Sequence, residues 1–235
     1  MGICLFDAKV LLEYGHKDAL CEYLCAVYLS KTPPILKAMA SQLTWSGPVE
    51  VDGQPAVYLT FDDGPHPEIT VEVLDVLARN KVPATFFCVG QNAEKHPQII
   101  RRIRDEGHEV GNHTYAHESG WKTSNFQYLK SYARCQELLD ARSFRPPYGR
   151  ITRSQAAALQ DETNIIMWDV LSGDFDENKT ADMCFDELLT NTRPGAIVVF
   201  HDSVKAADRM LPVLEPYLRW LHEEGYTCRL LPVSS

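Results

Sequence analysis

The stretch AVYLTFDDGP, residues 56–65, decides the fold and points to the chemistry of the chain. Its first five residues are mostly apolar, which is typical of a strand buried on both faces of a parallel sheet. Two adjacent carboxylates, Asp62 and Asp63, stand just after this run, and a Gly-Pro pair then turns the chain. Acidic side chains after the carboxyl end of a parallel strand are where α/β proteins commonly carry their sites.

Two imidazoles four residues apart, His113 and His117, follow about fifty residues later in the segment HTYAH. One Asp with two His is a three-ligand set that leaves a coordination position open for water, as a catalytic zinc site requires. The other carboxylate could then accept a proton from that water. His201 and Asp202, at the end of the apolar run 196–200, add a second acid/base group. Together these residues predict a hydrolase.

Each of these features also has an ordinary structural interpretation. Asp-Gly is a common turn pair, and the His and Arg residues could be polar loop or surface residues. Asp169 and Asp202 are expected to support the site from outside or to face solvent. No single ordinary interpretation explains why all the candidates follow successive strands.

From residue 56 onward, short apolar segments alternate with segments of helical periodicity, which predicts an α/β fold with a parallel sheet. Each candidate catalytic residue follows a different predicted strand, which favours a closed or nearly closed barrel over an open sheet. Strands are predicted at residues 56–60, 84–89, 109–111, 143–144, 164–168, 196–200 and 227–231, and helices at 70–80, 93–105, 126–141, 153–160, 181–190 and 211–224.

The first fifty residues differ in character from the rest. Short helical pieces are predicted at 10–14, 19–29 and 35–43, separated by glycine and proline. We therefore predict two parts, an N-terminal helical extension of unknown role at 1–50 and a catalytic domain at 51–235.

Charge restricts the partners of the chain, which has 235 residues and a formal net charge of −9. No cluster of Lys and Arg of the kind that follows phosphate backbones occurs, so we expect no nucleic-acid partner. Neutral sugars or small amides suit this charge better than large polyanions, although a local basic patch could reverse that preference. No obligate protein partner is indicated.

No secretion signal or membrane-spanning segment is predicted. Asp7 and Lys9 interrupt the first apolar stretch, and the next one contains Glu22 and is too short to span a bilayer. We therefore expect a cytoplasmic location, with the cell envelope as the alternative if the substrate is cell-wall material. The seven scattered cysteines are then expected to be reduced thiols.

Five motifs occur in a fixed order along the chain: TFDDGP at 60–65, HTYAH at 113–117, RPPYG at 145–149, WD at 168–169 with Asp174, and IVVFH at 197–201. This set closely resembles the polysaccharide deacetylase (NodB-homology) family, carbohydrate esterase family four, over about residues 55–232. The resemblance implies a distorted (β/α) barrel with about seven parallel strands, related to the TIM barrel. It also implies metal-dependent removal of acetyl groups from N-acetylated sugars such as chitooligosaccharides or peptidoglycan.

The resemblance implies roles for the charged residues of these motifs. Asp63, His113 and His117 would hold one divalent metal ion, usually zinc, with cobalt, nickel or manganese as alternatives. Asp62 would be the catalytic base and His201 the general acid.

It likewise implies roles for the residues around them. Arg145 would orient the base, and Asp174 would tune the acid. The backbone N–H of Tyr148 would stabilise an oxyanion. Contacts to the substrate are expected from Pro147, Tyr148, Trp168 and Phe175.

Two positions depart from the family pattern, Phe175 where tryptophan is usual and Val199 where leucine is usual. Both remain apolar, so they bear on the shape of an acetyl pocket more than on the chemistry. Two other functions stay open. The same scaffold would serve an amidohydrolase of a small non-sugar amide or imide, or an O-acetyl esterase. An inactive carbohydrate-binding relative is disfavoured because ligands, base, acid and orienting Arg are all present.

Overall fold

The apolar run at residues 56–60 lies in an interior strand of the sheet. In the computed structural model, which describes residues 31–232, this run belongs to β2 (Gln54–Asp62), whose last seven residues are all buried. Parallel neighbours cover it on either side, β3 (Thr85–Cys88) and β8 (Ile197–His201). Burial on both faces explains why the strand reads as a continuous apolar run instead of an alternating one.

Seven parallel strands form a curled half-barrel, which confirms the predicted fold class. Their order across the sheet is β6 (Asn164–Ile165), β5 (Ser143–Phe144), β4 (Glu109–Asn112), β3, β2, β8 and β7 (Val170–Leu171). Two short strands pair with β2 outside this path, β1 (Glu50–Val51) in antiparallel and β9 (Thr227–Cys228) in parallel orientation.

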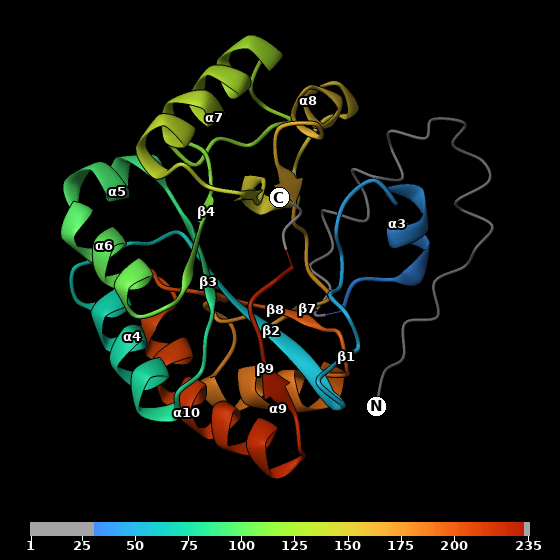
Figure 1. Ribbon diagram of the computed structural model, residues 1–235, viewed down its shortest axis with the longest axis vertical. Coiled ribbons are helices and arrows are strands. Elements are labelled where there is room, and N and C mark those ends of the chain that lie inside the picture. The colour runs from blue at the N-terminus through green and yellow to red at the C-terminus, as the bar shows by residue number, and fades with distance from the viewer. Residues whose placement is uncertain (1–30, 233–235) are drawn as a thin grey trace.

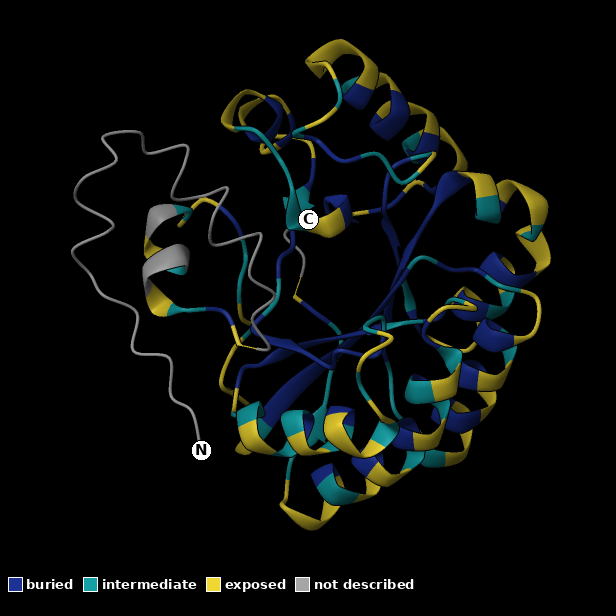
Figure 2. Ribbon diagram, turned by 180° about the vertical axis from the view of Figure 1, so that it is seen from behind, coloured by how far each residue is buried: buried dark blue, intermediate teal, exposed yellow. Residues whose placement is uncertain are grey.

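Helices surround the strands along one long arc in Figure 1. Figure 2 shows that they turn their buried faces inward and their exposed faces outward. The largest core cluster fills this space between strands and helices, with Phe61 stacked between Phe86 and Phe200. The helices are α4 (Ile69–Asn80), α5 (Gly90–Lys95), α6 (Pro97–Asp105), α7 (Asn125–Leu139), α8 (Arg153–Leu159), α9 (Ala181–Asn191) and α10 (Ala207–Glu223). No helix within the described range is long and apolar enough to cross a membrane.

Proline explains one error in the predicted helices. The single helix predicted at 93–105 is wrong, because the chain breaks into α5 and α6 at His96 (φ −128°, ψ 53°), the residue before Pro97. Proline disfavours the helical conformation for the residue that precedes it, and suits the first position of a new helix.

The helix predicted at 211–224 begins earlier, at Ala207, and contains Pro212 and Pro216. Both prolines are exposed and lie four residues apart on one helix face. The carbonyl groups that lose a donor there can bind water, so the helix tolerates both prolines.

The strand predicted at 164–168 is also wrong in length, because β6 ends at Ile165 and the unpredicted β7 follows at Val170. The last predicted strand, 227–231, is only two residues long in β9. The predicted helix at 35–43 is present as the shorter α3 (Pro34–Met39), and those at 10–14 and 19–29 lie outside the described residues.

Residues 31–47 lie along the open side of the half-barrel, between its terminal strands β6 and β7. Thr44 pairs with the backbone just after β6, donating to Ile165 O at 2.9 Å and accepting from Met167 N at 2.7 Å. Thr32 N donates to Asp169 O at 3.0 Å. These residues therefore contact the barrel closely, and the predicted boundary at residue 50 stays a prediction.

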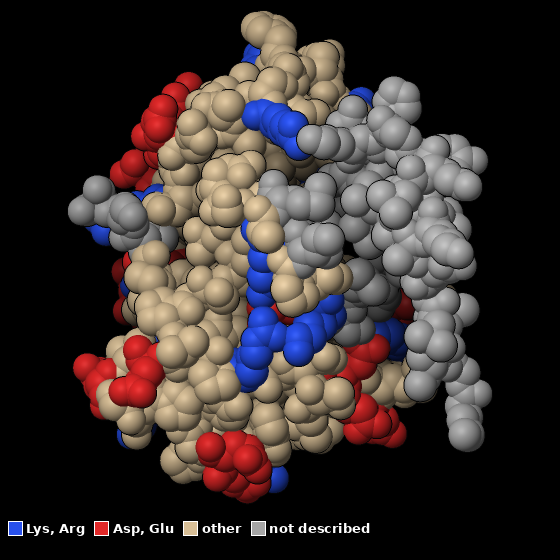
Figure 3. All heavy atoms as spheres, turned by 90° about the vertical axis from the view of Figure 1, so that its right-hand side faces the viewer, with Lys and Arg blue, Asp and Glu red and all other residues tan. Residues whose placement is uncertain are grey.

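A buried carboxylate holds this side of the barrel together. Asp169 is 0% exposed and pairs with Lys37 of α3 and with Arg193, whose Nη2 lies 2.7 Å from it. Figure 3 faces this side of the molecule, and Lys and Arg side chains gather near its centre. Asp169 is thus one of the acidic residues that support the structure from behind the site.

Removing the Asp169 carboxylate should destabilise the fold more than removing an exposed one. Asp169→Ala leaves Lys37 and Arg193 without their shared partner, so we expect the free energy of unfolding to fall by about 2 kcal/mol. The control is Asp75→Ala, because the Asp75 side chain is 52% exposed in its pair with Arg102 and should contribute less than about 1 kcal/mol. Urea denaturation measures both losses, and equal losses would contradict this role of Asp169.

Candidate active site

The carboxyl ends of four strands of the sheet, β5, β4, β2 and β8, converge on one point. Asp62 and His201 are direct register partners across β2 and β8. His113 follows β4, with its N–H donating to Cys88 O at 3.0 Å, and Arg145 follows β5, with its N–H donating to Asn112 O at 3.0 Å. Parallel pairing therefore brings together residues up to about 140 positions apart in the sequence.

Asp63, His113 and His117 form a compact group in which one ligand atom from each lies within 4.8 Å of the others. Asp63 Oδ1 is 3.1 Å from His117 Nε2 and 3.8 Å from His113 Nε2. Asp63 (φ 85°) and His117 (φ 57°) both have left-handed backbone conformations. Such conformations are strained for residues other than glycine and concentrate at functional sites. The predicted ligand set is therefore assembled in space.

The environments of His113 and Asp63 favour the protonation states that a metal needs. His113 Nδ1 lies 2.7 Å from Arg145 O, and because a carbonyl only accepts, Nδ1 carries the proton and Nε2 keeps a free lone pair. Burial lowers the pKa of His113 to about 4, which keeps the ring neutral. Burial would raise the pKa of Asp63, but the hydrogen bond from His117 and the neighbouring imidazoles hold it well below its usual range.

The candidate base, Asp62, is oriented by a buried guanidinium. Arg145 is 0% exposed, and its Nη1 donates to Asp62 Oδ1 and to Thr60 Oγ1, both at 2.7 Å. Its Nη2 donates to Met167 O at 3.0 Å, and its guanidinium carbon lies 4.2 Å from the centroid of the Phe87 ring. Arg145 can therefore fix the direction of the carboxylate without itself reaching solvent.

The candidate acid, His201, is held by two bonds to one carboxylate. Asp174 Oδ2 accepts from the His201 backbone N–H at 2.8 Å, and Oδ1 lies 2.7 Å from the ring Nδ1. Burial opposes the charged ring, but the Asp174 carboxylate outweighs it and raises the pKa of His201 to about 9. Phe175 packs edge-on against the ring, with 5.1 Å between the centroids.

The RPPYG loop forms one wall beside the candidate ligands. Tyr148 is 58% exposed, and its ring centroid lies 4.6 Å from that of His117. Pro147 is buried, and Trp168 packs beneath the loop so closely that a Cβ on Gly149 would meet the indole ring at 2.6 Å. Only glycine fits there, and its φ of 66° also suits glycine.

Asp202 supports the turn that carries Asp62 and Asp63. It is 1% exposed, accepts from the Gly64 N–H at 3.0 Å and from the Thr70 hydroxyl, and burial raises its pKa to about 7. A Cβ on Gly64 would lie 2.1 Å from Asp202 Oδ2. The sequence indicates one half of this contact, the acidic residue beside His201. It does not indicate the partner of Asp202, which is Gly64, 138 residues earlier.

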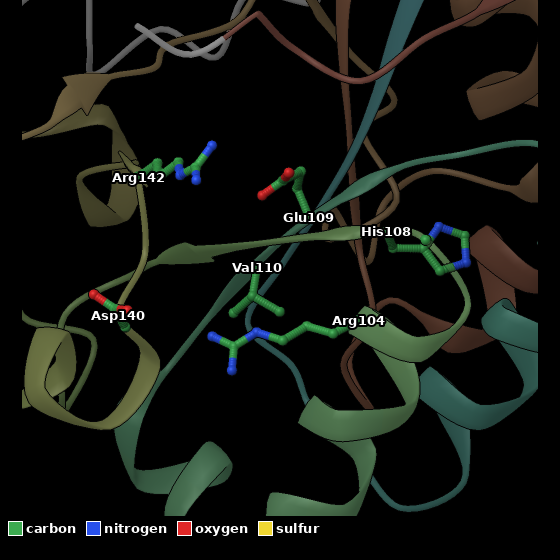
Figure 4. A pocket seen from close by; sticks show the side chains of 7 residues that line it. Arg104, His108, Glu109, Val110, Asp140 and Arg142 are labelled. Atoms are coloured by element: carbon green, nitrogen blue, oxygen red, sulfur yellow. The ribbon is translucent and has the colours of Figure 1, made fainter. Parts of the chain in front are cut away.

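A separate hollow of about 370 Å³ lies at the opposite ends of the strands, next to the start of β4. Figure 4 shows Arg142 and Glu109 reaching toward the same open space, with Arg104 below Val110. Arg104 also donates to Leu139 O at the end of α7. None of the predicted catalytic or ligand residues lines this hollow.

Comparison with known proteins agrees with this geometry. A family model described as polysaccharide deacetylase matches residues 50–163. Over 186 residues the chain is 37% identical to a peptidoglycan-N-acetylglucosamine deacetylase of Bacillus cereus, and the aligned region covers 73% of this chain and 66% of that protein. Over 203 residues it is 37% identical to a chitooligosaccharide deacetylase of Sinorhizobium fredii, and the aligned region covers 77% of this chain and 92% of that protein.

A solved structure extends the similarity to three dimensions. The crystal structure of the Bc1960 peptidoglycan N-acetylglucosamine deacetylase superposes with a TM-score of 0.78 at 32% sequence identity, and covers 86% of this chain and 96% of that one. The chain therefore belongs to the polysaccharide deacetylase family, carbohydrate esterase family four, and is a hydrolase of that family.

Proposed function

We propose that this enzyme removes N-acetyl groups from N-acetylglucosamine-containing oligo- or polysaccharides of the chitooligosaccharide or peptidoglycan type. The observation that supports this most strongly is the pairing of Asp62 with His201 across two strands, beside a separate group of three ligand residues. The relatives that match over most of the chain are named for deacetylation of such sugars. A peptidoglycan substrate would favour the cell envelope, and a small oligosaccharide the cytoplasm.

Asp63, His113 and His117 suit one divalent metal ion, and we propose zinc. Two neutral imidazole nitrogens and one carboxylate oxygen are a common catalytic zinc set, and cobalt, nickel and manganese are alternatives. An ion held there would polarise the acetyl carbonyl and lower the pKa of a water molecule. The Nδ1–H of His113, bonded to a backbone carbonyl, gives this ligand a fixed direction before any ion arrives.

Asp62 would accept the proton from the attacking water. Arg145 binds one carboxylate oxygen of Asp62 and supplies a compensating charge for this carboxylate, which is 4% exposed. The Arg145 guanidinium also donates to Thr60 and to two backbone carbonyls. These bonds hold it in place when Asp62 accepts the proton from water. Arg145 is thus a positioning residue and Asp62 the base.

His201 would donate a proton to the leaving amine. Its Nδ1 is occupied by Asp174, which leaves Nε2 as the nitrogen that can donate to substrate. An amide nitrogen leaves only when protonated, so an acid that stays charged at neutral pH is required. The pKa of about 9 satisfies this requirement.

Substrate contacts would come from the wall around these groups. The Tyr148 N–H would donate to the oxygen of the tetrahedral intermediate, and such a donor is typically worth roughly 3 kcal/mol. Phe175 and Trp168 would shape the acetyl pocket, with Pro147 buried behind them. Val199 is 1% exposed within β8, so its departure from the family pattern acts on packing.

Acetate release from a substrate panel tests the proposed function. We expect turnover of chitooligosaccharide or peptidoglycan fragments that a chelator abolishes and added zinc restores, because Asp63, His113 and His117 form one compact ligand group. The control substrates are acetylxylan and small imides. Release from only these controls would favour an O-acetyl esterase or a small-amide hydrolase, and no release from any would favour an inactive relative.

Substitutions of the two adjacent aspartates, Asp62 and Asp63, should have different effects on metal content and turnover. Asp62→Asn removes the proton acceptor but keeps an oxygen for Arg145, so metal content should stay near wild type while kcat falls about 10²–10⁴-fold. Asp63→Asn should instead lower metal affinity, because a neutral amide is a poorer ligand. Elemental analysis beside steady-state kinetics measures both effects, and the reverse pattern would exchange the two roles.

The alkaline side of the pH–rate profile should report His201. The protonated form of His201 predominates below its pKa of about 9 and is lost above it, so kcat should fall as the pH rises through about 9. Asp174→Asn removes the carboxylate that raises the pKa, so the fall should move to lower pH by about one to three units.

A substrate with a good leaving group provides the control for this role. His201→Ala should slow amide hydrolysis about 10²–10⁴-fold, but a nitrophenyl acetate much less, because nitrophenolate leaves without a proton. An equal loss on both substrates would make His201 an oxyanion donor or a structural residue.

A further inference from the structure

Arg150 stands at the rim of the site with its charge uncompensated. It directly follows the RPPYG loop, and its guanidinium carbon lies 5.8 Å from the centroid of the Tyr148 ring and 5.4 Å from that of the Trp121 ring. The Tyr148 ring in turn contacts the ring of His117, a candidate metal ligand. The rings of Trp121 and Tyr148 therefore hold the Arg150 guanidinium near the candidate ligand His117.

The backbone around Arg150 is firmly held. Gly120 N donates to Arg150 O at 3.0 Å, and Trp121 Nε1 donates to Ile151 O at 3.3 Å. Gln155 Nε2 also donates to Gly120 O at 2.9 Å. The loop after His117 and the loop after Tyr148 are thus joined into one wall, and Arg150 does not depend on an ion pair for its position.

No hydrogen bond or ion pair within residues 31–232 involves the Arg150 side chain, and its Nε is buried without a partner. Other arginines of the site region differ in this respect. Arg145 is paired with Asp62, and Arg209 donates to Asp174 O at 2.6 Å. A guanidinium without a carboxylate partner is available to bind one from a ligand.

The charge of the protein makes this cation significant. A net charge of −9 disfavours anionic glycans, and Asp63 adds, at the site itself, a carboxylate that has no Lys or Arg partner within residues 31–232. A substrate that carries a carboxylate therefore needs a local cation beside the reacting sugar. Among the rim residues, Arg150 is placed to supply it through its planar, bidentate group.

We propose that Arg150 binds a carboxylate on the sugar residue next to the N-acetyl sugar that is deacetylated, with Tyr148 and Trp121 as its aromatic supports. The proposal rests on the proposed function and narrows its substrate class to glycans with alternating neutral and carboxylated sugars. The carboxylate could belong to the lactyl ether of muramic acid or to a uronic acid, and the chemistry of recognition is the same.

Acetate release from matched tetrasaccharides tests this inference. The first is an N-acetylglucosamine–N-acetylmuramic acid tetrasaccharide with free lactyl carboxylates, and the second is the same molecule with those carboxylates converted to amides. A hyaluronan tetrasaccharide tests a uronic acid as the source, and chitotetraose tests the deacetylase activity alone. Because the first two differ only in charge, the ratio of their kcat/KM values isolates the carboxylate.

We expect wild type to favour the free acid over the amide about tenfold, mainly through KM, as one charge-assisted hydrogen bond would provide. Arg150→Gln should bring the ratio near one, and Arg150→Lys should keep part of it. Arg153→Gln, which changes an exposed arginine three residues away, should keep the wild-type ratio. Preference for the hyaluronan fragment over the muramyl one would identify a uronic acid as the partner.

Three results would overturn the inference. If the kcat/KM ratio of free acid to amide is near one for wild type, and acetate is released from chitotetraose, then the enzyme has no carboxylate subsite but is still a deacetylase. A ratio that Arg150→Gln leaves unchanged assigns the preference to another group. Absence of release from all four substrates would overturn the proposed function together with this inference.

Discussion

The rest of the site depends on one buried cation, the Arg145 guanidinium. A charge without solvent must be compensated, and burial lowers the pKa of Arg145 because water no longer stabilises it. The compensation comes from Asp62, Thr60 and the carbonyls of Ile166 and Met167. These partners belong to two separate segments of the chain, β2 and the backbone that leaves β6, so satisfying one guanidinium aligns both of them with Arg145 after β5. The half-barrel thus acquires its shape and its reactive geometry from the same interaction.

The backbone after β6 is held from the opposite side as well. Arg145 binds its carbonyls from within the barrel, while Thr44 and Thr32 pair with it from outside and Lys37 reaches Asp169. Because no ladder joins β6 to β7 within residues 31–232, these contacts take the place of a closing strand. Trp168 lies between the two sets of contacts, so residues 31–47 help to set the wall against which the RPPYG loop packs.

Sequence patterns predicted what is local or carried by the order of motifs. Apolar runs located the strands that are buried on both faces, and the ligands, base and acid followed their carboxyl ends. The break at His96 is a local effect of Pro97 that the helical periodicity concealed. The other errors are the early start of α10 and the division of 164–171 into two strands, which pair with different neighbours on opposite edges of the sheet. Partners far apart in sequence, such as Asp169 with Lys37, leave no periodic signal, because either residue alone resembles a surface charge.

Left-handed backbone conformations and paired charges occur together at the site. Asp63, His117 and Tyr148 each occupy left-handed conformations that cost of order 1–3 kcal/mol for such residues, so neighbouring contacts must hold them there. Asp202 fixes the turn after Asp63, and Trp168 fixes the loop after Tyr148. Asp62 and Asp174 each have a fixed cationic partner, whereas Asp63 faces only imidazoles. A carboxylate held in strain without a permanent cation suits the metal-ligand role that we propose for Asp63, and the paired carboxylates Asp62 and Asp174 suit the other two roles that we propose for them.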